Sequence, residues 1–276
     1  METPKAPQRL KDRGKHPADV PRPYKLAVVI PDLHVPHEDK RSVAAVEQYL
    51  ADEKWDYWIC IGDLVDNDAI SAFNAGKPRK ITQAPTVQEQ FSEANLFLNR
   101  HLSTVTRHNP TVDLVYLEGN HEERTERYVD RNPELQGLVD IEQALRLKQR
   151  GVKYVRFWST GELYQLGKLY IGHGAYAVQN HAAKHVRDFG CNIMYGHTHD
   201  VQQFTVKQRG KNQTLLAQSI GCLCAHDQPY MRGRPTNWST AFAIVYLYPD
   251  GLFQHEVVMI QKHRFVGPTT GKLYQG

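Results

Sequence analysis

The stretch Tyr116–Arg124 reads YLEGNHEER and places a cluster of polar residues directly after an apolar run. That run, VDLVYL at 112–117, has the apolar, β-branched and aromatic content of a buried strand. In open α/β sheets ligands bind at the edge where such strands end, so the cluster indicates a ligand site. A plainer interpretation is a helix start, with Asn120 as N-cap and the carboxylates of Glu122 and Glu123 in the first turn. The other strand ends of the chain decide between the two.

Four further apolar runs end in polar residues in the same way. They are VVIPDLH, WICIGDLVD, LYIGHG and IMYGHTH, and their polar ends are Asp32, His34, Asp63, Asp66, His173, His197 and His199. Four of the five runs carry a glycine at the junction, as expected where backbone and a bound ion approach too closely for a Cβ. Each short motif alone is common. Their joint occurrence at strand ends predicts convergence on one site.

The order of the predicted elements favours an α/β fold. Strands at 24–30, 56–61 and 112–117 alternate with helices at about 38–52 and 86–107, and helical segments follow over about 121–150. After Gly151 the chain becomes largely β, with a helix near 179–188 and strands at 152–158, 162–167, 168–172, 191–196, 201–206, 213–220, 240–251 and 254–260. We predict one compact domain of two sheets over residues 24–276.

Bulk properties limit the classes of protein. Residues 1–23 are rich in Pro, Lys and Arg and predict a flexible basic arm, which could contact phosphates. No apolar window approaches a membrane span and no apolar signal segment precedes residue 24, so a cytoplasmic protein without membrane contact is expected. The net charge of +4 leans only modestly towards anionic partners. Four cysteines are too few for a disulfide framework, and the CLC spacing at 222–224 is not that of a zinc ribbon.

The motif series Asp-x-His, Gly-Asp-x-x-Asp, Gly-Asn-His-Glu, Gly-His and Gly-His-x-His resembles the calcineurin-like metallophosphoesterase family over roughly Lys25 to Asp200. The resemblance implies a four-layer sandwich of two mixed β-sheets flanked by helices. It also implies hydrolysis of phosphate esters by two divalent metal ions, with a hydroxide between the ions attacking phosphorus. The mixed oxygen and nitrogen ligand set favours Mn and leaves Fe, Zn and Ni open.

The resemblance also implies a role for each motif residue. Asp32, His34 and His199 would hold the first metal, Asn120, His173 and His197 the second, and Asp63 would bridge them. His121 would act as the acid that protonates the leaving group, and Asp66 would orient it and raise its pKa. Gly119 would be the junction that lets Asn120 and His121 reach the centre. For Glu122, a helix-start carboxylate and a carboxylate that supports the ligands remain equally open.

Two positions depart from the family's phosphatases. The protein Ser/Thr phosphatases and the symmetrical diadenosine tetraphosphate hydrolases carry arginines that grip the substrate phosphate where this chain has Asn67 and Glu118. Neither Asn nor Glu can replace a bidentate guanidinium, so a phosphomonoester or phosphoprotein substrate becomes less favoured. Arg124 and Arg127 could take over, although a solvated helix face paired with Glu123 and Glu126 is the favoured alternative.

Softer candidates complete the predicted site. His37 could line the pocket or lie on a surface loop. The long segment 225–238 could shape the substrate pocket or be an ordinary surface loop, and its candidate substrate-binding residues are His226, Tyr230, Arg232, Arg234 and Trp238. His181 and His185 lie four residues apart without the glutamate of a zinc-protease motif, so we predict that they are surface residues.

The sequence therefore predicts a metal-dependent phosphoric ester hydrolase that acts on phosphodiesters of a nucleotide or nucleic acid. Three alternatives remain: a phosphomonoesterase that acts on proteins or small molecules, a DNA nuclease, and a non-catalytic scaffold with the same fold. The oligomeric state is open.

Overall fold

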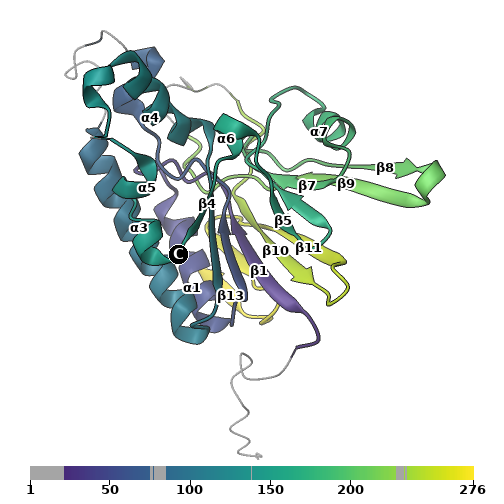
Figure 1. Ribbon diagram of the computed structural model, residues 1–276. Coiled ribbons are helices and arrows are strands. Elements are labelled where there is room, and N and C mark those ends of the chain that lie inside the picture. The colour runs from purple at the N-terminus through teal and green to yellow at the C-terminus, as the bar shows by residue number, and fades with distance from the viewer. Residues whose placement is uncertain (1–21, 75–76, 78–84, 138, 228–232, 234) are drawn as a thin grey trace, which may run out of the picture.

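Two mixed β-sheets stand face to face in the computed structural model, which describes residues 22–74, 77, 85–137, 139–227, 233 and 235–276 (Figure 1). The first sheet has the strand order β11-β10-β1-β2-β3-β4. Strands β1 to β4 run parallel, and β10 and β11 complete the sheet in antiparallel pairings. The bounds are β1 (Lys25–Ile30), β2 (Tyr57–Cys60), β3 (Asp113–Leu117), β4 (Lys153–Val155), β10 (Ala241–Leu247) and β11 (Phe253–Met259).

The second sheet has the order β5-β6-β7-β9-β8, with β6, β7 and β9 parallel and the two edge strands antiparallel. Its strands are β5 (Tyr164–Leu166), β6 (Leu169–Ile171), β7 (Asn192–Tyr195), β8 (Gln203–Gln208) and β9 (Gln213–Ser219). A separate hairpin, β12 (Arg264–Val266) and β13 (Leu273–Gln275), packs on the first helix, where the rings of Tyr49 and Tyr274 lie 5.1 Å apart.

Helices cover the outer faces of both sheets. The helices α1 (Lys40–Asp52) and α3 (Val87–His108) lie on the first sheet, and α7 (His181–Phe189) lies on the second (Figure 1). The others are α4 (Asn120–Arg131), α5 (Ile141–Ala144) and α6 (Phe157–Thr160), with short 3₁₀ turns at Asp68–Ile70, Ala72–Asn74, Pro133–Leu135, Lys148–Arg150 and Arg209–Lys211. Thr86 starts α3 with a capping box, because it exchanges hydrogen bonds with Glu89.

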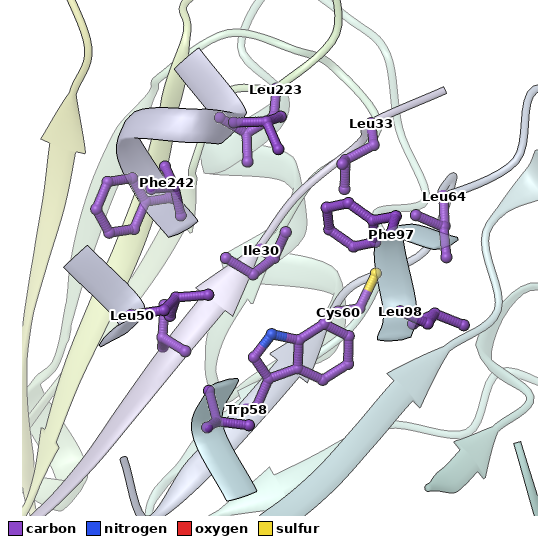
Figure 2. Packing of buried hydrophobic residues seen from close by; sticks show 14 of the residues in the cluster. Ile30, Leu33, Leu50, Trp58, Cys60, Leu64, Phe97, Leu98, Leu223 and Phe242 are labelled. Atoms are coloured by element: carbon purple, nitrogen blue, oxygen red, sulfur yellow. The ribbon is translucent and has the colours of Figure 1, made fainter. Parts of the chain in front are cut away.

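Successive side chains of a strand point to opposite faces of the sheet, and this alternation builds the layers. In β1, Leu26, Val28 and Ile30 face the helices α1 and α3, whereas Ala27 and Val29 face the second sheet. Figure 2 shows the helix-side core, in which Trp58 and Cys60 lie beside Phe97 and Leu98. A third cluster, which includes Val186 and Ile193, joins α7 to the second sheet. The predicted sandwich of helices, two mixed sheets and a further helix is confirmed.

Parallel pairing brings the strand ends to one edge. Ile30 pairs with Cys60 and Cys60 with Tyr116, so the residues that follow β1, β2 and β3 leave the first sheet together. In the second sheet Ile171 pairs with Met194, and the residues after β6 and β7 emerge together too. This register, set by the buried faces of the strands, gathers the polar motifs.

One predicted element is wrong in detail, and one element was not predicted. The strand expected over 152–158 is only Lys153–Val155, and the chain turns into α6 at Phe157, whose side chain is buried. The hairpin of β12 and β13 was not expected. Residues 1–21 of the predicted arm lie outside the described residues; Arg22, at its end, forms an ion pair with Glu53 at 2.7 Å. Among the described helices, none combines the length and apolar character needed to cross a membrane.

Candidate metal centre

One group of converging side chains joins both sheets. Asp32, His34, Asp63 and His199 each offer a ligand atom, and these atoms lie within 4.8 Å of one another. The Nε2 atoms of His34 and His199 are 3.1 Å apart, and Asp63 Oδ2 lies 3.6 Å from His34 Nε2. All four residues are buried. Two imidazoles and two carboxylates at these separations match the donor set of a transition-metal ion.

A second group shares one residue with the first. His173 and His197 offer ligand atoms within 4.8 Å of each other and of Asp63. Asn120 Oδ1 lies 2.8 Å from His197 Nδ1 and 3.1 Å from His173 Nε2. The structure therefore brings together every residue that the sequence assigned to a metal, with Asp63 common to both groups.

The backbone and the buried polar atoms fit cations at this position. Asp32 Oδ2 is buried and finds no hydrogen-bond partner among the described residues. Positive backbone φ angles occur at Asp32, His34, Asp63, His197 and His199. Residues other than glycine adopt this conformation rarely and at a cost in free energy. Such strain at five of the seven candidate ligands is typical of a functional site.

The charge of the site also favours a cation. Burial lowers the pKa of His173, but Asp63 and Asp32 outweigh it and raise this pKa to about 10. His199 behaves likewise: burial lowers its pKa, and the contacts with Asp32 and Cys224 outweigh this and raise it to about 10. The buried carboxylates are therefore stabilised by nearby positive charge. Divalent ions would supply this charge while the imidazoles stay neutral as ligands.

Glycines bring the loops close enough to converge. A Cβ on Gly119 would lie 2.2 Å from Asp63 Oδ1, and one on Gly196 would lie 2.1 Å from Asp32 Oδ2. Gly62, at φ +99°, would place a Cβ 2.6 Å from the backbone nitrogen of Gly119. No larger residue fits at these three junctions, as the sequence pattern predicted.

His121 lies beside the candidate ligands and is held by Asp66. Its Nδ1 donates to Asp66, 2.9 Å from Oδ1 and 2.8 Å from the backbone oxygen, and its Nε2 is 3.8 Å from Asp63 Oδ2. Asp66 Oδ1 also accepts from His34 Nδ1 at 2.9 Å. Burial lowers the pKa of His121, but Asp63 and Asp66 outweigh it and raise the pKa above its ordinary value. The pairing with Asp66 has the geometry that the sequence predicted.

Glu122 supports the loops that carry the ligands. It is fully buried, and its carboxylate accepts hydrogen bonds from the backbone N–H of Asp63 at 2.8 Å, Leu64 at 2.9 Å and Gly119 at 2.9 Å. It also accepts from the Tyr116 hydroxyl at 2.7 Å. Of the two interpretations left open for Glu122, support of the ligand loops describes these contacts, although the residue also lies in the first turn of α4.

The two candidate arginines, Arg124 and Arg127, lie in different surroundings. Arg124 reaches the site, where Nη1 donates to the Asp66 backbone oxygen and Nη2 donates to His121 Nε2, both at 2.8 Å. Arg127 instead forms an ion pair with Glu123 at 2.7 Å on the exposed helix face. The helix-face interpretation thus holds for Arg127 but not for Arg124.

Asn67 and Glu118, at the positions where the family's phosphatases carry arginine, form hydrogen bonds within the protein. Asn67 is buried and donates from Nδ2 to the His121 backbone oxygen at 2.8 Å. Glu118 accepts from the backbone N–H and the hydroxyl of Ser159 at 2.8 and 2.7 Å.

Trp158 lies beside two candidate ligands and was not among the predicted site residues. Its ring centroid lies 5.0 Å from that of His197 and 5.8 Å from that of His173, and the contact of Glu118 with Ser159 anchors its short helix. Trp238 packs against the opposite group, with its ring 4.3 Å from that of His199. Both indoles are partly exposed. Trp158 sat in a segment expected to be a strand, so no local signal marked it.

The softer candidates are spread around the centre. His37 is half-buried, and its Nε2 lies 3.2 Å from Asp68 Oδ2 and 3.8 Å from Asp66 Oδ2, so it borders the site. His226 is exposed, and its ring lies 5.9 Å from that of Trp238. Tyr230, Arg232 and Arg234 lie outside the described residues.

His181 and His185 are not surface residues, contrary to the prediction. Both are buried, because α7 packs this face on Tyr195 of the second sheet. His181 Nδ1 lies 2.6 Å from the Tyr195 hydroxyl and its Nε2 lies 3.0 Å from Asp200, the residue after His199. His185 Nε2 accepts from the backbone N–H of Ala175 at 2.9 Å. The pair therefore ties α7 to the loops that follow β6 and β7.

Comparison with known proteins identifies the family. The model of the calcineurin-like phosphoesterases (Metallophos) matches residues 26–232, and the chain belongs to that family. The resemblance drawn from the motifs is thereby confirmed.

Two phage proteins are similar over most of the chain. The Gene 54 protein of Mycobacterium phage L5 is 27% identical over 259 residues, which are 87% of this chain and 96% of that protein. The Gene 54 protein of Mycobacterium phage D29 is 25% identical over 236 residues, which are 80% of this chain and 88% of that protein.

Solved structures are more distant. Vps29 of Entamoeba histolytica, solved with Zn²⁺, is 15% identical with a TM-score of 0.44, covering 91% of this chain and 97% of that one. The nuclease MPE of Pseudomonas putida is 12% identical with a TM-score of 0.35, covering 91% of this chain and 87% of that one.

Proposed function

We propose that the protein is a two-metal phosphoesterase that hydrolyses phosphodiesters of nucleotides or nucleic acid. The position of Asp63 carries the proposal, since its carboxylate belongs to both groups of candidate ligands. The Nε2 atom of His121 lies 3.8 Å from Oδ2 of this carboxylate. Two ion sites that share a carboxylate, with an imidazole beside them, are the parts that a two-metal mechanism of phosphoester hydrolysis uses.

Each group of residues has one task in this proposal. Asp32, His34 and His199 would hold one cation, Asn120, His173 and His197 the other, and Asp63 both. The cations would neutralise phosphate charge and lower the pKa of the attacking water. Mn²⁺ remains the favoured ion, with Fe, Zn and Ni as alternatives, because imidazole and carboxylate ligands suit all four.

His121 is proposed to protonate the leaving group through Nε2. Its Nδ1–H is held by Asp66, which leaves Nε2 facing the substrate side. Arg124 Nη2 donates to that Nε2, which favours the neutral imidazole and opposes the rise in the pKa of His121 that Asp63 and Asp66 cause. A substrate phosphate would draw the guanidinium away and free His121 Nε2 to carry a proton. The released guanidinium of Arg124 would then bind the substrate phosphate.

Three observations support a diester over a monoester. Asn67 and Glu118, at the positions of the family's phosphate-gripping arginines, are engaged with His121 and Ser159. Trp158 and Trp238 pack against the histidines of opposite groups and present partly exposed indoles, on which bases can stack. The chain also has a positive net charge.

The first experiment compares two chromogenic esters. Metal-stripped protein is given Mn²⁺ and assayed on bis-p-nitrophenyl phosphate and on p-nitrophenyl phosphate. We expect faster diester cleavage that a chelator abolishes. Faster monoester cleavage would replace the proposal by a phosphomonoesterase. No turnover on these esters, on nucleotides or on DNA would leave only the scaffold alternative.

The Asp63→Asn variant tests the shared carboxylate. It removes one charge from both ion sites, so we expect loss of turnover together with loss of bound metal, measured by elemental analysis after dialysis. Glu123→Asn, on the partly exposed face of α4, is the matched control and should keep both. An active Asp63→Asn protein with its metal content intact would refute the bridging role.

A further inference from the structure

A second cluster of metal-binding atoms lies behind the candidate centre. Cys222, Cys224 and His199 are buried, and each offers a ligand atom within 4.8 Å of the others. Neither cysteine is part of a disulfide. The cysteines have no place in the proposed hydrolysis, and His199 faces them through Nδ1, the nitrogen that the candidate centre does not use.

The local sequence explains why both sulfurs face one point. In extended backbone, residues i and i+2 share a side, so the CLC stretch points Cys222 and Cys224 one way and Leu223 the other. Leu223 is part of the helix-side core, as Figure 2 shows. The segment is fixed on both sides, since the Cys222 N–H donates to Ser239 and the Leu223 N–H donates to Asp32, both at 3.0 Å.

His226, from the same segment, borders the cluster without joining it. Its Nε2 lies 3.8 Å from Cys222 Sγ and 3.2 Å from the Thr240 hydroxyl, but it is not within 4.8 Å of both sulfurs. His199 Nδ1 lies 3.8 Å from Cys224 Sγ. In a tetrahedral zinc site with Zn–S near 2.3 Å and Zn–N near 2.0 Å, each sulfur is about 3.5 Å from each nitrogen. The pair of Cys224 and His199 is therefore spaced within a few tenths of an ångström of that geometry. The ring of Trp238 packs against the rings of both histidines.

We propose that Cys222, Cys224 and His199 Nδ1 bind a thiophilic divalent cation, with Zn²⁺ as the ion that fits best. Two thiolates and an imidazole favour Zn²⁺ over Mn²⁺. Binding releases the thiol protons and the Nδ1 proton of His199 to solvent. The imidazole of His199 then links this ion to the proposed dinuclear centre.

Cobalt spectroscopy tests the site without any assay of activity. Metal-stripped protein is titrated with Co²⁺, which takes the place of Zn²⁺ and gives a near-ultraviolet charge-transfer band only when thiolate is a ligand. We expect the band in wild-type protein, its loss in Cys222→Ser and in Cys224→Ser, and its displacement by Zn²⁺. Cys191→Ser is the matched control, because Cys191 lies away from the cluster, just before β7, and it should keep the band.

A measurement on wild-type protein covers the case in which a cysteine variant does not fold. X-ray absorption of zinc-loaded protein should show sulfur scatterers at about 2.3 Å in addition to nitrogen and oxygen near 2.0 Å. Nitrogen and oxygen neighbours alone, with every added ion bound, would overturn the proposal, as would a cobalt band that survives loss of either Cys222 or Cys224. Because neither readout depends on turnover, failure of this site leaves the proposed hydrolysis untouched, and the reverse also holds.

Discussion

Backbone strain is concentrated on the residues proposed to bind metal. Asp32, His34, Asp63, His197 and His199 occupy left-handed φ values, each of which costs on the order of 1–3 kcal/mol outside glycine. The contacts that hold them come from distant segments: Asp32 accepts from the His197 N–H at 2.9 Å, and Asp63 accepts from the His121 N–H at 2.9 Å. The strain is thus maintained by hydrogen bonds between ligand loops.

Replacement of His121 by alanine should separate metal binding from acid catalysis. Because His121 is proposed to donate a proton and not to bind metal, we expect unchanged metal content and turnover reduced about 10²–10⁴-fold on esters with poor leaving groups. A good leaving group such as p-nitrophenolate needs little protonation, so the loss there should be much smaller. Equal rates for variant and wild type on alkyl esters would exclude His121 as the acid.

Glu122→Gln should loosen the ligand loops. The new amide NH₂ would face backbone N–H groups that now donate to a carboxylate, and an unsatisfied buried donor costs about 1–3 kcal/mol. We expect that loss in the free energy of unfolding, measured in urea, and weaker metal binding. The control Glu123→Gln alters only a partly exposed ion pair with Arg127 and should stay within about 0.5 kcal/mol of wild type. Equal stability of the two variants would contradict the supporting role.

At the scale of elements, the short helix α6 and the helix α7 act on the site from outside the five motifs. Helix α6 brings Trp158 against His197 and His173, and Glu118 holds it there. Helix α7 reaches the loop of His199 through the pair of His181 and Asp200. Each helix therefore carries a separate prediction.

Trp158→Ala should affect nucleotide substrates more than small ones. Loss of a stacked base costs about 1–3 kcal/mol, so kcat/KM for the p-nitrophenyl ester of thymidine 5′-phosphate should fall roughly 5- to 150-fold. Methyl p-nitrophenyl phosphate has the same leaving group and no base, so its kcat/KM should change little. A parallel fall for both esters would assign Trp158 to packing of His197 alone.

His185 should make α7 sensitive to acid. Burial lowers the pKa of His185 to about 4; the hydrogen bond to the His181 backbone oxygen and the charge of Asp188 oppose this, whereas the charges of His181 and Lys184 add to it. Because the folded pKa lies below the unfolded value of about 6.5, the stability from neutral His185 is complete above pH 6.5 and is lost as pH falls towards 4. The loss is about 2–3 kcal/mol.

Urea unfolding at pH 7 and pH 4.5 measures this effect. Wild-type protein should lose more stability between the two pH values than His185→Gln, which cannot be protonated there. The difference between the two proteins removes the contribution of other titrating groups. If both lose the same amount, His185 is not the acid-sensitive group.

At the scale of the whole molecule, the proposed centre lies where two sheets meet. The loops that follow β1 and β2 of the first sheet supply Asp32, His34 and Asp63. The loops that follow β6 and β7 of the second sheet supply His173, His197 and His199. An ion bound to residues of both sheets would stabilise their association. We therefore expect folding and metal binding to be coupled.

Removal of metal should lower the melting temperature of the whole chain. Ligand at about 100 times its Kd adds about 2.7 kcal/mol, which for a protein of this size corresponds to a shift of several degrees. We expect metal-stripped protein to melt lower and Mn²⁺ to restore the value, as followed by circular dichroism. Asp63→Asn should respond to Mn²⁺ much less. A melting temperature independent of metal in wild-type protein would contradict an ion site between the sheets.

The sequence by itself determined the layered α/β fold and the polar residues that converge. Strand alternation assigns each β1 side chain to one core or the other, and parallel strands end at one edge, so motifs at strand ends meet. Both properties are local to a strand or follow from its direction. They can be inferred from residue type and spacing.

Only the tertiary structure decided which side chains outside the motifs join them. It separated Arg124 from Arg127, buried His181 and His185, brought Trp158 to His197 and placed the two cysteines behind His199. Each outcome depends on packing between segments far apart in the chain, and residue spacing carries no information on that packing. The physical reason is that local periodicity fixes which face a residue occupies, whereas the neighbour on that face is fixed only when the layers assemble.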